Sequence, residues 1–188
     1  MTSNTTALYS RIKPNKLLLE IPLYLTFNLL LVACSYLSFN LPFSPVPITG
    51  QTFGVLLVAM ALGRVRGTGI VLAYLLEGAL GLPVFAGGTA GLAKFMGPTG
   101  GYLIGFVAAA YLVGYLADKG WDRKYFSSVL AMSLGTAVIF LFGLSWLAYF
   151  VPTQALLTAG LYPFVQGALV KIALASVVLP SVWKFINK

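Results

Sequence analysis

The chain has 188 residues, of which 59% are hydrophobic and only 9% are charged, and its mean hydropathy is +0.92. Soluble globular domains carry about a quarter charged residues. This composition therefore excludes a soluble nucleotide-binding domain, a disulfide-stapled secreted module and a disordered tail. The formal net charge of +8 comes from basic residues spread between apolar runs. That spacing is typical of membrane topology, so nucleic acid is not expected as a partner.

The composition also limits the chemistry available to the chain. The sequence has no histidine and a single cysteine, Cys34, which lies in an apolar run and is interpreted as a small hydrophobic residue. An internal disulfide is therefore impossible. Both Walker motifs are missing from the sequence, so the chain is not expected to hydrolyse ATP. We predict neither enzymatic activity nor a metal or cofactor.

Apolar runs long enough to cross a bilayer, about 20 residues each, recur along the chain. The first expected helix, 17–39, is too long for a secretory signal peptide and lacks its cleavage site. We predict a cytoplasmic segment over 1–16 and one six-helix membrane domain over 17–188, an all-α integral membrane fold. The other five helices are expected over 51–63, 67–82, 99–117, 125–149 and 162–179.

The segments between these helices are rich in residues that interrupt regular structure. Prolines exclude a helix over 41–50, and glycines predict a loop over 83–98. Such backbone is tolerated at a membrane edge where it is buried or lines a cavity. We therefore expect these outer loops to cap an outward-facing pocket. The charged segment 118–124 is predicted to be a solvated turn, and Pro180 is predicted to mark the far end of the last helix.

The distribution of basic residues predicts the orientation. Six passes place both termini on one side of the membrane, and cytoplasmic loops carry an excess of Lys and Arg. We therefore predict cytoplasmic termini and a multi-pass protein of the bacterial cytoplasmic membrane. The basic residues on that side are Arg11, Lys13, Lys16, Arg64, Arg66, Lys119, Arg123, Lys124, Lys184 and Lys188.

Three charged residues fall outside this pattern: Lys94, Lys171 and Glu77. Lys171 lies nine residues into the last expected helix, or roughly 14 Å deep at 1.5 Å per residue. Glu77 lies roughly 7–8 Å below the outer end of the third helix. A charge at the bilayer centre costs about 2.5–3.5 kcal/mol, so such side chains usually face the protein interior. We expect Glu77 and Lys171 to share a cavity that opens outward, with a structural ion pair as the alternative.

Four motifs in this chain closely resemble the BioY family of biotin transporters. They are PVPITGQ over 45–51, GLPVFAGG over 81–88, GPTGGYLIGF over 97–106 and YPFxxGxxxK over 162–171. The similarity extends in order from about Leu17 to the end. It implies six helices, a biotin site near the outer surface and docking on a separate energy-coupling factor (ECF) module. That module would comprise a transmembrane coupling subunit and two ATPase subunits. The chain departs from the family pattern at Ala168, where the family usually has aspartate.

The chemistry of biotin suggests which residues would bind it. Its carboxylate needs a cation, for which Lys94 and Lys171 are both available. Its ureido group needs acceptors and donors, and its rings need aromatic walls. The resemblance and these needs together predict the following ligand-binding residues: Lys171, Glu77, Lys94, Phe85, Gly87, Gln51, Tyr74, Tyr102, Phe164 and Gln166.

These observations predict a membrane subunit for biotin uptake that captures the vitamin at the outer face and transfers it to an ATP-driven module. The alternatives are a stand-alone biotin facilitator and a subunit for a different vitamin, which Ala168 leaves open. A membrane enzyme would need clustered acids or a nucleophile paired with a base. A structural helical adaptor would have no reason to carry an intramembrane lysine. The partners expected are biotin, the lipid bilayer and the coupling module.

Overall fold

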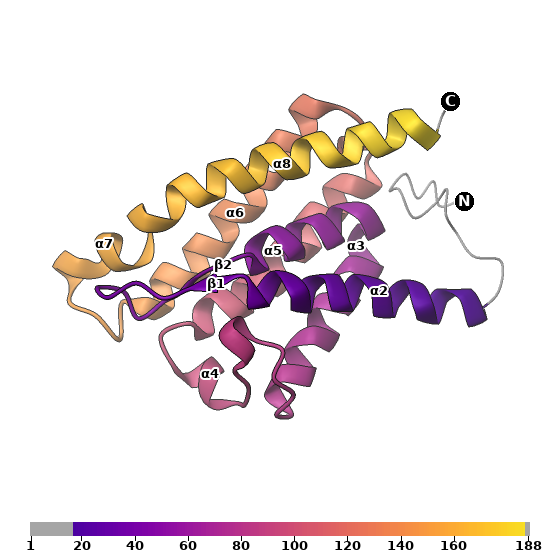
Figure 1. Cartoon of the computed structure of the whole chain (residues 1–188). Coiled ribbons are helices and arrows are strands. Elements are labelled where there is room, and N and C mark those ends of the chain that lie inside the picture. The colour runs from indigo at the N-terminus through magenta and orange to yellow at the C-terminus, as the bar shows by residue number, and fades with distance from the viewer. Residues whose placement is uncertain (1–16, 187–188) are drawn as a thin grey trace.

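The computed structural model describes residues 17–186, and nearly all of the regular structure is helical. Five long helices pack into a bundle whose described ends both lie at the same end of the molecule (Figure 1). The predicted segment 1–16, with Arg11, Lys13 and Lys16, lies outside the described residues, as does Lys188. The long helices are α2 (Leu17–Tyr36), α3 (Gln51–Ala79), α5 (Gly100–Asp118), α6 (Tyr125–Leu147) and α8 (Tyr162–Ile186).

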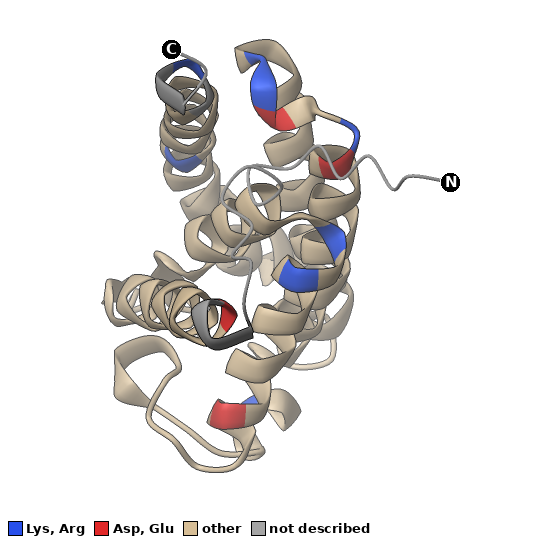
Figure 2. Cartoon of the chain, turned by 90° about the vertical axis from the view of Figure 1, so that its right-hand side faces the viewer, with Lys and Arg blue, Asp and Glu red and all other residues tan. Residues whose placement is uncertain are grey.

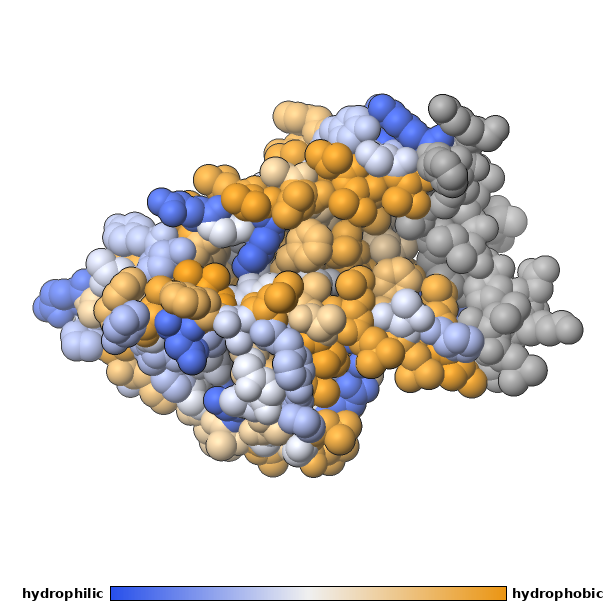
Figure 3. Space-filling view, viewed as in Figure 1, coloured by the Kyte–Doolittle hydropathy of each residue, from blue (hydrophilic) through white to orange (hydrophobic). Residues whose placement is uncertain are grey.

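The helices have the length and surface of membrane spans. Within residues 17–186, four helical stretches are long and apolar enough to cross a bilayer: Gln51–Ala79, Gly100–Asp118, Tyr125–Leu147 and Thr153–Val182. Large apolar side chains also cover much of the outside of the bundle (Figure 3), with Leu29 on α2 65% exposed and Leu169 on α8 63% exposed. Because water would penalise such a surface, the mostly helical membrane class predicted from composition is confirmed.

Helix α3 consists of two helical arms that follow each other without a loop, and the second arm folds back along the first. Its backbone leaves the helical region at Gly63, where φ is 78° and ψ is −177°. Glycine alone adopts such angles without strain. Beyond the turn, Gly67 lies against the backbone of Ala59, and the Tyr74 hydroxyl meets Gln51 at the far end of the first arm. The two predicted helices over 51–63 and 67–82 are therefore joined by a turn at Gly63, and the second ends at Ala79.

The first predicted helix ends earlier than expected. It stops at Tyr36, because Ser38 and Phe39 form a short strand, β1 (Ser38–Phe39), that pairs antiparallel with β2 (Ile48–Thr49). The proline-rich segment predicted to be non-helical runs mainly between these strands. Pairing the strands ties the chain that leaves α2 to the start of α3. Cys34, near the end of α2, is buried as a small hydrophobic residue.

Several connectors are more ordered than the sequence predicted. The glycine-rich segment contains η1 (Ala86–Gly88) and α4 (Ala93–Met96), and the connector after α6 contains η3 (Thr153–Ala155) and α7 (Leu156–Gly160). The predicted end of the last helix at Pro180 is wrong, because α8 continues to Ile186. Proline removes one helical hydrogen bond, but neighbouring helices make such a loss tolerable in membrane proteins.

The predicted solvated turn over 118–124 is exposed at Lys119, Arg123 and Lys124, but the prediction is wrong for its acids. Asp122, in η2 (Trp121–Arg123), is fully buried. The Asp118 carboxylate accepts a hydrogen bond from the Arg64 backbone N–H at 3.1 Å. These acids therefore face the protein, and Asp118 ties the end of α5 to the turn of α3.

Glycines let the central helices approach closely. Gly114 on α5 leaves no room for a side chain beside the backbone of Arg64, and Gly105 on α5 lies against Ile139 on α6. In lipid, helices associate through such packing because burial of apolar surface gives no advantage over contact with acyl chains.

Much of the Lys and Arg ribbon lies at the end that Figure 2 turns toward the viewer.

Candidate functional site

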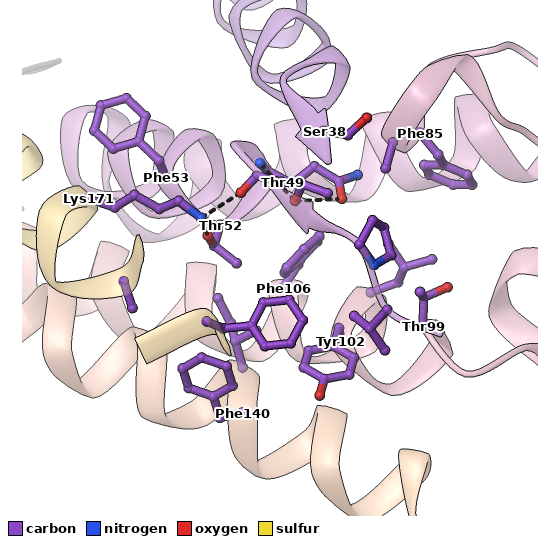
Figure 4. Close-up of a pocket in the computed structure, with 18 of the residues that line it drawn as sticks. Ser38, Thr49, Thr52, Phe53, Phe85, Thr99, Tyr102, Phe106, Phe140 and Lys171 are labelled. Atoms are coloured by element: carbon purple, nitrogen blue, oxygen red, sulfur yellow. Dashed lines mark hydrogen bonds between the residues drawn. The ribbon is translucent and has the colours of Figure 1, made fainter. Parts of the chain in front are cut away.

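A cavity of about 530 Å³ lies between the helices and the short segments at one end of the bundle. Its walls come from the first turns of α3 and from α5, α6 and α8, and the segments 38–49 and 85–99 complete it (Figure 4). Small-molecule sites usually measure about 300–1,000 Å³ and are mostly apolar with a few well-placed polar groups. The cavity therefore has the size and the mixed lining of a site for one small ligand.

Lys171 is the best-anchored cation of the cavity wall. Its Nζ donates to the carbonyl of Thr49 at 2.5 Å and to Oγ1 of Thr52 at 3.0 Å, and its side chain is half-buried (Figure 4). An ammonium has three N–H donors and no acceptor. Since both protein partners are neutral oxygens, the positive charge is oriented but not neutralised by them. One donor remains for a ligand oxygen.

Gln51 lines the cavity at the start of α3, with its amide held from both sides. Its Nε2 donates to the Tyr74 hydroxyl at 2.5 Å, and its Oε1 accepts from Thr49 Oγ1 at 3.2 Å. The Tyr74 hydroxyl in turn donates to the carbonyl of Val84 at 2.9 Å. Tyr74 is fully buried and does not line the cavity. Its role in this arrangement is to connect Gln51 with the segment that precedes Phe85.

Phe85 forms one apolar wall in a fixed position. Its ring makes edge contacts with Tyr74 and Phe95, with centroid distances of 5.6 and 5.8 Å. The ring also lies against Gly78 on α3, where even a methyl group would overlap it. Because these contacts hold the ring on several sides, Phe85 presents a preformed surface to the cavity.

Tyr102 and Phe164 extend the aromatic wall on other helices. The Tyr102 hydroxyl donates to the carbonyl of Gly160 at 2.8 Å, and its ring lies against Gly143. Phe164, in the first turn of α8, packs beside Phe140 of α6 with a centroid distance of 6.4 Å. Both predicted residues line the cavity.

The segment after Phe85 turns tightly beside the cavity. Gly87 and Gly88 have positive φ angles of 65° and 72°. These conformations allow Phe85 N–H to bond the carbonyl of Thr89 at 3.0 Å and Gly88 N–H to bond the carbonyl of Phe85 at 2.9 Å. Because residues with a Cβ rarely adopt such angles, the glycine pair shapes this edge. Gly87, which was predicted as a ligand-binding residue, lines the cavity.

Lys94 contributes a second cation from α4. It lines the cavity and is half-buried, and no other residue of the described range hydrogen-bonds or ion-pairs with its ammonium. The backbone around it is anchored, because Thr99 Oγ1 donates to the Lys94 carbonyl and Trp146 Nε1 donates to the Gly97 carbonyl. The two predicted lysines therefore line one cavity in different states, one tethered and one free of described partners.

Glu77 does not share this cavity with Lys171, which corrects the arrangement expected from depth. The buried face of the second arm of α3 carries Val71, Tyr74 and Gly78, and Glu77 lies at its margin. There its Oε1 accepts a hydrogen bond from Asn28 Nδ2 of α2 at 3.0 Å. The alternative of a Glu77–Lys171 ion pair is also not formed. Helical rotation, which depth along the axis does not reveal, separates the two side chains.

Helix α8 turns Gln166 away from the cavity. Phe164, Ala168 and Lys171 recur at the spacing of one helical face and all line the cavity, whereas Gln166 is exposed on another face. Ala168, the position at which the chain departs from the motif, lies on the wall one turn before Lys171. It supplies a methyl group where the motif has a carboxylate. None of the described residues that line the cavity is acidic.

Several polar lining residues were not predicted from the sequence. Thr49 and Thr52 orient Lys171, and the PVPITGQ motif contains Thr49 and ends directly before Thr52. Asn40 and Thr136 also line the cavity, but each is a single polar residue beside or within an apolar run. No spacing rule distinguishes such residues from those that merely pack.

A helical membrane bundle with a preformed cavity, aromatic walls and inward-facing cations defines a class of protein, namely an integral membrane protein that holds a small ligand among its helices. The chain is a member of the BioY family, whose model matches residues 6–188. The resemblance inferred from the four motifs is thereby confirmed.

Known proteins similar to the chain support the same assignment. A biotin transporter BioY from Thermotoga maritima is 38% identical over 154 residues, covering 81% of this chain and 88% of that protein. A probable biotin transporter BioY from Pyrococcus horikoshii is 40% identical over 134 residues, covering 71% and 78%. The crystal structure of the S-component for biotin from an ECF-type ABC transporter superposes with a TM-score of 0.81 at 27% identity, covering 91% of this chain and 94% of that one. These relatives are transport proteins, so the prediction that the chain is not an enzyme is confirmed.

Proposed function

We propose that this chain takes up biotin as the substrate-capturing subunit of an ECF-type transporter. The observation that carries the proposal is the cavity itself, which sets the Lys171 ammonium among aromatic walls in a member of the BioY family. Biotin combines an apolar bicycle and chain with a carboxylate and a ureido group. A cavity whose surfaces complement these groups can bind biotin without any catalytic residue.

The described contacts divide the proposed site into three parts. Lys171 offers its third N–H to a ligand oxygen, and Lys94 supplies a second cation from the opposite segment of the wall. Phe85, Tyr102 and Phe164 pack against the apolar parts of the ligand. Gln51 and Gly87 also line the cavity, Gln51 with its amide and Gly87 with its backbone.

In this proposal the remaining predicted residues do not contact the ligand. Tyr74 positions Gln51 through its hydroxyl, and Glu77 joins α3 to α2 through Asn28. Gln166 is exposed and does not line the cavity. We therefore expect changes at these positions to alter stability more than they alter ligand contacts.

Binding to the purified chain tests the capture function. Titration calorimetry in detergent should show one biotin bound per chain, with desthiobiotin and thiamine as controls. Stoichiometric binding of thiamine but not biotin would identify a different vitamin and would overturn the proposal. Desthiobiotin lacks the ring sulfur but keeps the ureido group and carboxylate, so its relative affinity measures the contribution of the bicycle.

We further propose one membrane domain over 17–188 with six passes and cytoplasmic termini. The two arms of α3 count as two passes, and α2, α5, α6 and α8 supply the others. The turn of α3 and the segment 118–124 would then face the cytoplasm, and the cavity would open outward. The polar segment 1–16 would remain in the cytoplasm of a bacterial cell.

Cysteine accessibility tests this orientation. In a Cys34→Ser background, a membrane-impermeant maleimide should label Gln154→Cys in intact cells but leave Lys124→Cys unlabelled until the cells are opened. Both positions are exposed in the structure, so a difference reports sidedness rather than burial. The reverse pattern would overturn the orientation without affecting the assignment of the cavity.

Transport energy comes from a partner in this proposal. The ECF context of the similar S-component supports docking on a transmembrane coupling subunit with two ATPase subunits. Co-purification of the tagged chain with those subunits, followed by ATP-dependent biotin uptake in proteoliposomes, tests the coupling. Uptake by the chain alone at the same rate would favour the stand-alone facilitator.

A further inference from the structure

A cluster of cations and tyrosines lies at the end of the bundle away from the cavity. Arg64 follows the turn of α3, and Tyr111, Tyr115 and Lys119 lie along the last turns of α5 and just beyond it. The Arg64 guanidinium lies over the rings of Tyr111 and Tyr115, at 5.6 and 5.8 Å from their centroids. The Lys119 ammonium lies over the same Tyr115 ring at 4.4 Å.

Two cations gathered on one ring repel each other, and the ring alone does not neutralise them. A tyrosine face contributes about 0.5–1 kcal/mol per cation at an exposed site. Within the described range, the guanidinium of Arg64 and the ammonium of Lys119 form no hydrogen bond or ion pair. The neighbouring carboxylate of Asp118 accepts from the Arg64 backbone N–H, and it attracts the Arg64 side chain through space without a hydrogen bond to the guanidinium. The N–H donors of both cations are therefore available to an external anion.

The surface that leads to these cations is apolar and aromatic. Ile104, Tyr111 and Tyr115 lie on one face of α5 and are 44%, 54% and 38% exposed. Their spacing of seven and four residues continues to Lys119, which is also exposed. An apolar helical stripe that ends in cations matches a molecule with an acyl chain and an anionic headgroup.

We propose that Arg64 and Lys119 bind the phosphate of an anionic phospholipid whose acyl chain lies along this face of α5. The phosphate oxygens accept from both cations, while the exposed tyrosine rings contact the glycerol region. Aromatic rings of this kind are enriched where the membrane meets water. The proposal requires only that this end of the bundle lies at a membrane surface, and it does not depend on which vitamin occupies the cavity.

Lipid binding by the purified full-length chain tests this site. Native mass spectrometry in detergent can compare titrations with dioleoyl phosphatidylglycerol and dioleoyl phosphatidylcholine. We expect the wild-type chain to prefer phosphatidylglycerol. Arg64→Gln and Lys119→Gln should each weaken its binding roughly fivefold, and the double variant roughly thirtyfold, with no change for phosphatidylcholine.

A double variant with the same change in charge provides the matched control. Lys124 and Lys184 are exposed basic residues outside the cluster, and Lys184 lies over a different ring, that of Tyr125, at 4.7 Å. Lys124→Gln with Lys184→Gln should keep the lipid preference. Arg64→Lys, which retains a cation, should keep most of it. Unchanged biotin binding by the Arg64→Gln/Lys119→Gln variant would show that it is folded, because neither residue lines the cavity.

Three results would overturn the proposal. They are equal binding of the two lipids by the wild-type chain, an equal loss of preference in the control variant, and displacement of phosphatidylglycerol by millimolar inorganic phosphate. The last result would assign the cluster to free phosphate rather than to a lipid headgroup. If Arg64→Gln/Lys119→Gln does not fold, the single variants decide the question, because an unchanged lipid preference in both Arg64→Gln and Lys119→Gln at full biotin binding would overturn the proposal.

Discussion

Cations are held by different partners at the two ends of the bundle. At the cavity, Lys171 is oriented by the neutral oxygens of Thr49 and Thr52, and no acid of the described residues lines the wall. At the opposite end, Arg66 forms an ion pair with Glu20 at 3.5 Å, and Arg64 lies beside Asp118 and two tyrosines.

The difference shows that the groups around a cation decide whether its charge remains available to a ligand. Neutral oxygens orient an ammonium without cancelling its charge, so a ligand anion still gains a charge-assisted bond. At the opposite end, carboxylates and aromatic rings instead lie beside the cations and connect the ends of neighbouring helices. The predictions below test each half of this comparison.

The largest effect is expected from removing the cavity's tethered cation. Lys171→Ala should weaken biotin binding by about 1.5–3 kcal/mol, because a hydrogen bond from a charged donor is lost. Calorimetry measures the change. Lys184→Ala, on the same helix but exposed, should bind like the wild type. Unchanged affinity in a folded Lys171→Ala variant would remove this residue from the site.

The next largest effect is expected where Phe85 packs on α3. Gly78→Ala places a methyl group within the Phe85 ring and should destabilise the protein by about 1–3 kcal/mol. Thermal unfolding in detergent measures this change, and biotin affinity should fall with it. Gly69→Ala, in the same arm with no atom within 4 Å, is the control and should be neutral or slightly stabilising. Equal behaviour of the two variants would show that the wall is not preformed.

Removal of the hydroxyl behind Gln51 should have a smaller effect. Tyr74→Phe leaves the buried Gln51 amide without its acceptor, while the Val84 carbonyl keeps its bond from Ser35 Oγ, and the loss costs about 1–2 kcal/mol of stability. Tyr36→Phe removes a hydroxyl that bonds Pro83 at an exposed position, and it should cost less. Chemical or thermal unfolding of both variants compares the two sites. A larger loss of stability in Tyr36→Phe than in Tyr74→Phe would contradict the expectation that the buried hydrogen bond contributes more.

The smallest effect is expected at Glu77. Glu77→Leu breaks the bond to Asn28 and should lower stability by about 0.5–1.5 kcal/mol, whereas Glu77→Gln keeps an acceptor and should lower it less. Biotin affinity should be unchanged in both variants. A selective loss of biotin affinity with normal stability would return Glu77 to the ligand site.

Sequence reasoning located most of the helices and several cavity residues for simple physical reasons. Apolar runs of membrane length are visible in any sequence, because each span must satisfy its own backbone in lipid. The motif residues Phe85, Gly87 and Tyr102 were predicted as a site, and the structure places them on one cavity. The structure also places Lys171 on this cavity. The sequence indicated this residue because a charge within an apolar run has a high free-energy cost in the membrane.

The failures share a different cause, which is the rotation of one element against another. Glu77 and Gln166 were chosen for depth and chemistry, but helical phase turns both away from the cavity. Asp122 lies in a charged segment, yet the packing at η2 buries it completely. Neither outcome follows from spacing along one segment.

The sequence by itself therefore determined that the chain is a helical membrane protein and which of its motifs gather at one end. Composition and motif content are local properties, so they can be read from the sequence without knowledge of how the helices pack. Only the tertiary structure decided that Gly63 folds α3 back, that neutral threonine oxygens tether Lys171, and that Arg64 meets Lys119 over one ring. Each of these depends on segments distant in the chain, whose relative placement is set by how side chains pack between helices.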